Sequence, residues 1–430
     1  MDMEYNVPQT ETACGGDSVP ILTQKTPFLA SNREKIAALI IYLAAWCYLG
    51  RWPEGLAVFC ALFVAAGELL YWDVRRSGES LVWLGCLVVI CLSNWLGRGQ
   101  VWGEYYGLFM HLFGVYWLLC RSGRLSMGES STLLLLDALL GFVVIPFKHF
   151  FLRIRTVWYA LTHLCRSKRK KTQPESVLAL VLALIAALAL LVGAGSLLMR
   201  ADEGFFRLFS GFFSRFSLHL SADVCMRLLL SLPVGAYVFG LVAGAGREAQ
   251  DKLRARGDSV RAAIARLRHV PNAVWTAVLT VFLTLYVLFF CVQGSYLFGA
   301  FHRQLPEGFT VAAYARQGFF ELCGVMALNF ALLWLVTRTG NRSARETRAV
   351  CALCTALLAA SMLFAVVACS KLILYISCFG FTPKRLQSTW LVCVLFFGCA
   401  ASGYSLLTGR KSFRAWMIFG AVTLALLSVY

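Results

Sequence analysis

The chain has 430 residues, of which 59% are apolar and 14% are charged, whereas a soluble domain has about 45–50% apolar and about 25% charged residues. Its mean hydropathy is +0.69, and 40 Lys and Arg against 22 Asp and Glu leave a net charge of +18. These values exclude a soluble enzyme, a disulfide-rich secreted module, a collagen and a disordered tail. They predict an all-α, polytopic membrane protein with a basic surface.

Eleven apolar segments are candidate transmembrane helices, because a helix needs roughly 17–25 apolar residues to cross about 30 Å of hydrocarbon; the first of them, 36–49, is short and is expected to be extended by flanking residues. Residues 1–35 contain several Pro and Gly and lack the pattern of a cleaved signal, which predicts a flexible cytoplasmic tail followed by an uncleaved anchor. The eleven predicted spans are residues 36–49, 56–72, 81–96, 105–120, 177–199, 224–243, 273–297, 319–336, 350–370, 389–407 and 415–429.

A twelfth apolar run, residues 133–151, decides the topology of the N-terminal half. This run is interrupted by polar residues and a proline, namely Asp137, Pro146, Lys148 and His149. The positive-inside rule requires most basic residues to lie on the cytoplasmic side. The preceding basic residues satisfy this rule if the run does not span the membrane, and they violate it if the run spans. We therefore interpret it as an interfacial helix on the cytoplasmic face. The same rule predicts a cytoplasmic N-terminus and an external C-terminus, in the cytoplasmic (inner or plasma) membrane of the cell.

This topology divides the chain into the tail 1–35, the N-terminal transmembrane helices 36–120, an interfacial helix with a basic loop at 121–176, and a C-terminal transmembrane domain at 177–430. A further interfacial helix is predicted at 201–223, and a helix packed on neighbouring spans is the alternative. Its phenylalanines recur with helical spacing at Phe205, Phe206, Phe209, Phe212, Phe213 and Phe216.

Two basic clusters lie on the predicted cytoplasmic side. Such clusters attract anionic lipid headgroups at about 1 kcal/mol per charge, although the simpler interpretation is that they only fix the topology. Nucleic acid is not a predicted partner, because aromatic residues are not interleaved with these charges. One cluster is the loop from Arg247 to Arg268. The other cluster consists of Arg166, Lys168, Arg169, Lys170 and Lys171.

The sequence contains no P-loop, dinucleotide fingerprint, HExxH or nucleophile-elbow motif, and its six histidines lack the spacing of metal ligands. Cys351 and Cys354 form a CxxC pair, but a zinc site needs two more ligands, so helix packing is the favoured interpretation. We therefore predict no catalytic residue, no metal and no cofactor. Ala236, Gly240 and Gly244 recur every fourth residue, which favours close helix packing within the chain.

Polar residues within the predicted spans are informative, because a charge in hydrocarbon costs about 2.5–3.5 kcal/mol on insertion scales. Arg227 and Glu321 each lie near the outer end of a predicted span. Their opposite charges predict a structural ion pair, and a ligand or proton site is the alternative. Glu68, His111 and Asn329 are the other polar residues that stand out.

Two stretches resemble a known family. Residues 314–322 read YARQGFFEL and are followed by ALN at 327–329, which resembles the Y-A-R-x-G-F-F-x-L and A-L-N signature of the bacterial family domain of unknown function 4173, related to family 4153. The segment LYI at 374–376, with GFT at 380–382 and Arg385, is similar to a second signature. Lys371 stands where that signature has arginine. The resemblance covers roughly residues 175–410 and implies a bacterial membrane protein, without an activity.

These stretches complete a candidate polar cluster near the predicted outer boundary. Its arginine side chains have the geometry that binds a carboxylate or phosphate, including a lipid headgroup, whereas the favoured alternative is that the cluster locks the loop 298–318 in place. The predicted function is a non-catalytic membrane protein in sensing, scaffolding or envelope maintenance, and the alternative is a secondary transporter or permease. The cluster consists of Arg227, Tyr314, Arg316, Glu321, Asn329, Lys371 and Arg385.

Overall fold

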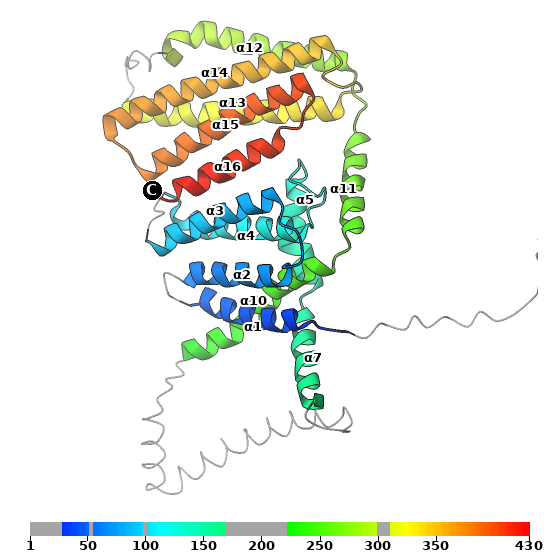
Figure 1. The fold of residues 1–430 in the computed structure, drawn as a ribbon. Helices are drawn as coiled ribbons and strands as arrows, with labels where there is room; N and C mark the ends of the chain where they lie inside the picture. Colours follow the sequence, from blue (N-terminus) through cyan, green and yellow to red (C-terminus); the bar gives the residue numbers. More distant parts are fainter. Residues whose placement is uncertain (1–27, 51–54, 98–100, 168–221, 299–309) are drawn as a thin grey trace, which may run out of the picture.

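The computed structural model describes residues 28–50, 55–97, 101–167, 222–298 and 310–430. In these ranges the regular structure is helical, apart from one isolated bridge between Val270 and Gly340. The helices lie side by side in an elongated stack (Figure 1). The all-α prediction is therefore confirmed for the described residues, while the predicted span 177–199, most of the helix at 201–223 and the basic residues 168–171 lie outside them.

A first bundle fills the lower half of the stack in Figure 1 and has its own hydrophobic core. The indole of Trp117 is fully buried there, and it lies so close to Gly67 that an added Cβ would come within 2.6 Å of the ring. The bundle consists of α1 (Asn32–Tyr48), α2 (Gly55–Leu70), α3 (Gly78–Trp95), α4 (Tyr106–Ser122) and α10 (Ala222–Arg247).

A second bundle, with a separate core, fills the upper half of the stack. Its helices are α12 (Asn272–Phe298), α13 (Val311–Thr339), α14 (Arg348–Phe379) and α15 (Pro383–Thr408). The last helix, α16 (Phe413–Leu427), joins the two bundles: Leu424 belongs to the first core, whereas the indole of Trp416 packs on Gly398 of α15.

Six of the described helices, α3, α10 and α12 to α15, are long and apolar enough to cross a membrane. The segment 134–148 and α7 (Leu152–Ser167), which meet at 42°, would add a seventh as a broken span or a re-entrant loop. The prediction of eleven spans is thus not supported. The physical reason is length, because α1, α2, α4 and α16 have 15 to 17 residues, at or below the lower end of the range of about 17–25 residues for a spanning helix.

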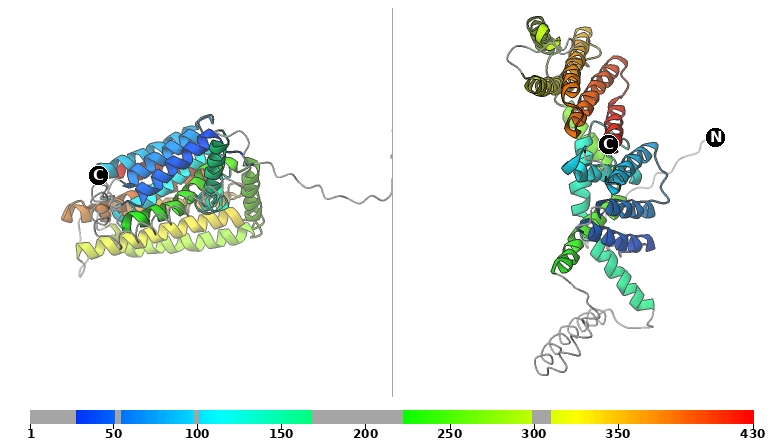
Figure 2. Two further views of the ribbon diagram at one scale, coloured as in Figure 1. Left: turned by 90° about the horizontal axis from the view of Figure 1, so that it is seen from below. Right: turned by 90° about the vertical axis from the view of Figure 1, so that its left-hand side faces the viewer.

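One end of the stack carries helices that run across the others. The helix α11 (Gln250–Ala265) crosses the helix ends on the right of Figure 1 and connects α10 to α12, and α7 runs in a similar direction (Figure 1; Figure 2, left). We call this end, where α1, α3, α12, α14 and α16 begin, the α11 face. The chain ends at the opposite face, where Figure 1 marks the C-terminus.

The crossing segment between α4 and α7 contains α5 (Leu134–Leu139), η2 (Leu140–Val144) and α6 (Ile145–Lys148). It packs on α10 through the predicted small residues. A Cβ at Gly240 would lie 2.7 Å from the Pro146 carbonyl oxygen, and one at Gly244 would lie 2.7 Å from the His149 ring. The close approach predicted for these glycines therefore occurs within the chain.

Candidate functional site

Asn329 joins three helices of the second bundle through buried hydrogen bonds. Tyr286 Oη of α12 donates to Asn329 Oδ1 at 2.6 Å, and Asn329 Nδ2 donates to Ser361 Oγ of α14 at 2.9 Å. The Ser361 hydroxyl in turn donates to the carbonyl oxygen of Leu357 at 2.9 Å. Because hydrogen bonds between helices hold membrane bundles together, this network explains why a polar residue that is 1% exposed lies in an apolar helix.

Lys371 of α14 is the buried charge of the second bundle. It is 1% exposed and lies about two turns before the end of α14. Its aliphatic chain packs on Gly318 of α13, where an added Cβ would lie 3.2 Å from Lys371 Cδ and 3.3 Å from Cε. Glycine at 318 therefore provides the space that the lysine occupies.

Glu321 lies one turn after Gly318 on α13, and its carboxylate interacts electrostatically with the Lys371 ammonium group. An ionisable residue inside a membrane helix is expensive and is a functional candidate by default. Lys371, with Gly318 and Glu321, is therefore the candidate functional site of the second bundle.

The Arg385 side chain binds the C-terminal end of α14. Its Nη1 donates to the carbonyl oxygen of Phe379 at 2.7 Å and to that of Gly380, and its guanidinium lies 4.1 Å from the centre of the Tyr375 ring. A cation at a helix C-terminus also complements the helix dipole. These contacts favour the locking interpretation for Arg385, although the segment it holds is the turn between α14 and α15.

The structure places the residues of the predicted cluster on α10, α13, α14 and α15, and the side chains of Tyr314 and Arg316 lie outside the described part of the chain. Tyr314 and Arg316 lie in the first turns of α13, the helix that carries Glu321 and Asn329. Arg227 lies in α10 of the first bundle, far from α13 of the second bundle (Figure 1; Figure 2, right). The structure therefore does not form the predicted Arg227–Glu321 pair. The two residues share a predicted depth, but depth alone does not make two helices neighbours.

Ion pairs that sequence reasoning missed lie at the α11 face of the first bundle. Arg121, which is 2% exposed, donates to the Glu68 carboxylate at 3.0 and 3.2 Å. It also donates to the carbonyl oxygens of Tyr71 at 2.6 Å and Val74 at 2.8 Å. Arg121 therefore caps the chain where it leaves α2. The only sequence signal was the position of both charges near helix ends.

Glu248, just after α10, accepts hydrogen bonds from Lys148 Nζ at 2.5 Å and from His149 Nε2 at 2.9 Å. Burial by itself would raise the pKa of Glu248, but these two donors outweigh burial and lower its pKa below the usual glutamate range. The contact ties α6 to α10.

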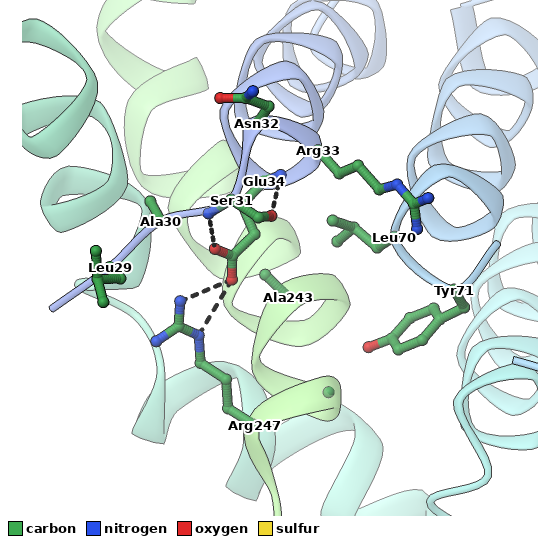
Figure 3. A pocket seen from close by; sticks show the side chains of 11 residues that line it. Leu29, Ala30, Ser31, Asn32, Arg33, Glu34, Leu70, Tyr71, Ala243 and Arg247 are labelled. Carbon is green, nitrogen blue, oxygen red and sulfur yellow. Dashed lines mark hydrogen bonds and ion pairs between the residues drawn. The ribbon is translucent and has the colours of Figure 1, made fainter. Parts of the chain in front are cut away.

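A pocket of about 830 Å³ opens at the α11 face between α1, α2 and α10 (Figure 3). Glu34 closes a capping box with Ser31 at the start of α1 and accepts a hydrogen bond from Arg247 Nη2 at 2.7 Å. Arg33 pairs with Asp73. The apolar part of the lining includes Leu29, Leu70 and Ala243, and Tyr71 lines the pocket too.

Burial raises the pKa of Tyr71, so this phenol stays neutral. Its hydroxyl donates to the Val242 carbonyl oxygen at 2.6 Å. The pocket thus combines two guanidinium groups, each paired with a carboxylate, with apolar walls, and it lacks a charged phenolate. Among the described residues, no group of three or more His, Cys, Asp or Glu side chains is arranged to hold a metal ion.

The family profile of a domain of unknown function, DUF4153, matches residues 36–430. The chain belongs to this family. The match corrects the resemblance to family 4173, and it extends the shared region from the C-terminal part to both bundles and α16. No curated protein and no solved structure matches the chain. The DUF4153 domain thus contains the α11 face as well as the Lys371 site.

Proposed function

We propose that this DUF4153 protein is a non-catalytic, multi-pass protein of the cytoplasmic membrane with a scaffolding, sensing or envelope-maintenance role. It contacts anionic lipid headgroups through α11. The observation that carries this proposal is the exposed basic surface of a helix that runs across the ends of apolar helices. Lipid headgroups lie at such a boundary, so basic residues there meet phosphate.

The basic residues of α11 and of the segment after it are exposed. Two acidic residues, Asp251 and Asp258, lie among them. At the end of this basic surface, Arg261 and Arg268 lie close enough to Arg338 of α13 for the three like charges to interact. A phosphate group would neutralise this repulsion. The exposed basic residues are Lys252, Arg254, Arg256, Arg261, Arg266 and Arg268.

The pocket in Figure 3 supports the same partner, since it lies at the α11 face and places Arg33 and Arg247 beside apolar side chains. The headgroup and upper acyl chain of an anionic phospholipid have this combination of chemistry. The positive-inside rule then orients the protein with the α11 face and the N-terminus in the cytoplasm, and with the C-terminus outside.

The lipid contact is tested with the full chain in nanodiscs of phosphatidylcholine, with and without phosphatidylglycerol. We expect a higher thermal unfolding temperature with the anionic lipid, and a smaller increase for Arg261→Gln/Arg268→Gln. Lys384→Gln, a charge removed at the start of α15 on the opposite face, is the control and should keep the full increase. An equal unfolding temperature in both lipids, or equal behaviour of the variants, would contradict the proposal.

The orientation is tested separately by reporter fusions. A fusion after Gly128, in the loop that follows α4, should report the cytoplasm, and a fusion at Tyr430 should report the external side. A cytoplasmic signal at Tyr430 would overturn the orientation without affecting the lipid contact.

A secondary transporter or permease is the second candidate, and one observation favours it. Lys371 is buried between α13 and α14 beside Glu321, and ionisable groups inside membrane helices mark ion and substrate pathways. In proteoliposomes, Lys371→Met should abolish uptake of a substrate from an anion panel while the protein stays folded. If wild type and variant show the same flux as empty liposomes, this candidate is wrong.

A further inference from the structure

A separate buried polar cluster lies at the α11 face, between α3, α4, α5 and the loop after α4. It contains two carboxylates, Glu79 at 4% exposure and Asp137 at 0%. Glu79 accepts hydrogen bonds from the Ser130 hydroxyl and, at 3.4 Å, from Trp83 Nε1. Arg414 Nε of α16 lies 3.2 Å from Glu79 Oε2. The negative charge of Glu79 therefore has both hydrogen-bond donors and a cationic partner.

The carboxylate of Asp137 has fewer hydrogen-bond donors than that of Glu79. Its Oδ1 accepts a hydrogen bond from the backbone N–H of Ser126 at 2.9 Å, whereas its Oδ2 is buried and has no hydrogen-bond partner in the described part of the chain. Two other buried oxygens there, Tyr116 Oη and Ser126 Oγ, make no hydrogen bond of ordinary geometry, although the Ser130 side chain lies beside Tyr116 and the Ser126 side chain lies beside Asp137. Tyr116, Ser126 and Asp137 come from three elements and are neighbours, since Ser126 donates to Asp137 and Tyr116 interacts electrostatically with it.

The charges around this place leave a negative excess. Tyr116 interacts electrostatically with Asp137, Glu79 and Cys120. Arg414 faces the cluster from α16, but it is shared between Glu79 and Glu129, whose Oε2 lies 3.2 Å from Arg414 Nη1. Burying a carboxylate without a counter-charge destabilises a fold, and so does each buried polar atom without a hydrogen bond. One bound positive charge would remove these destabilising effects together.

We propose that Asp137, Tyr116 and Ser126 form a binding site for one small cation, either an alkali metal ion or a proton. Carboxylate, phenol and hydroxyl oxygens are the ligands that hard cations prefer. A proton on Asp137 Oδ2 instead provides a donor for a neighbouring oxygen. Both ligands supply the same single positive charge.

The position of the site indicates what its occupancy affects. Gly257 of α11 covers the loop, because an added Cβ would lie 2.9 Å from Met127 Sδ and 3.2 Å from the Ser126 carbonyl oxygen. The neighbouring Arg414–Glu79 pair joins α16 to α3. A cation at Asp137 therefore stabilises the junction of α11, α16 and the first bundle.

The test uses the full chain in detergent and follows thermal unfolding. One arm compares sodium, potassium and N-methylglucamine chloride at equal ionic strength and weakly alkaline pH. The other arm lowers the pH to the mildly acidic range in N-methylglucamine chloride. An alkali ion raises the unfolding temperature by several degrees in the first arm, whereas a proton raises it in the second arm only. Asp137→Asn should lose either dependence.

Tyr116→Phe is the milder variant and decides the question if Asp137→Asn does not fold. It removes one proposed ligand and keeps the ring, so it should weaken the dependence on the cation while the protein stays folded. Asp73→Asn, an exposed carboxylate after α2, is the control and should behave like wild type. The proposal is overturned if the wild type responds in neither arm, or if both site variants respond exactly as the wild type does.

Discussion

In the first bundle the buried charges lie at helix ends, whereas the second bundle buries Lys371 and Asn329 within its helices. Arg121 is satisfied by a carboxylate and two backbone carbonyl oxygens. Lys371 lies in space left by a glycine and interacts with the Glu321 carboxylate, and Asn329 depends on hydroxyl groups of two other helices. The comparison teaches that the first bundle stabilises its buried charge at helix ends, whereas the second bundle accommodates polar groups within its helices by space and interhelical contacts.

The largest effect is expected where the first bundle depends on charge. Arg121→Met removes the buried member of the pair, which leaves the half-buried Glu68 with one fewer partner and two carbonyl oxygens unpaired, so we expect a loss of about 3–5 kcal/mol in the free energy of unfolding in detergent. Arg76→Met removes the exposed partner of the same Glu68 and should cost at most about 1 kcal/mol. Equal losses for the two variants would remove the distinction between buried and exposed pairs.

The second bundle should respond less to the loss of a polar group. Asn329→Leu removes the partner of Tyr286 Oη and Ser361 Oγ, and we expect it to cost about 1–2 kcal/mol, close to the upper values for hydrogen bonds between membrane helices. Thr337→Val is the matched control on α13, because its hydroxyl donates to the Leu333 carbonyl oxygen of its own helix. The same unfolding measurement checks both, and a larger cost for Thr337→Val would contradict the network.

The shape of the Lys371 site is tested by adding one methyl group. Gly318→Ala pushes against the lysine side chain, so we expect a loss of about 1 kcal/mol, which Lys371→Ala should reverse in the double variant. Gly324→Ala lies on the same helix, and its added Cβ meets nothing within 4 Å. It should be neutral or slightly stabilising. Additive effects of Gly318→Ala and Lys371→Ala would show that the two residues are not coupled.

The smallest effect is expected from pH at the charged end of the first bundle. Because the folded pKa of Glu248 is lowered, its contribution to stability is present above the unfolded glutamate pKa and is lost as the pH falls through the folded value. We expect the unfolding temperature of the wild type to fall below about pH 4 more steeply than that of Glu248→Gln. Parallel profiles would exclude a role of Glu248 in acid stability.

Several elements of the fold were predictable from the sequence. Apolar segments placed the helices of both bundles, since burial in hydrocarbon depends mainly on local composition. The spacing of Gly240 and Gly244 indicated a close contact, although not that Pro146 and His149 make it. The number of spans was not predictable in this way, because segments such as 36–49 and 105–120 are apolar but form helices of 17 residues, at the lower limit of the length that crosses a membrane.

Composition and basic residues were thus sufficient to determine that the chain is a bundle of apolar helices with one basic end. Tertiary structure alone decided which helices are neighbours. It separated Arg227 from Glu321, placed Lys371 on Gly318, and gathered Asp137, Tyr116 and Ser126 from three elements. The physical reason is that transfer into hydrocarbon is a property of each segment by itself, whereas pairing and unpaired oxygens depend on the packing of segments far apart in the chain.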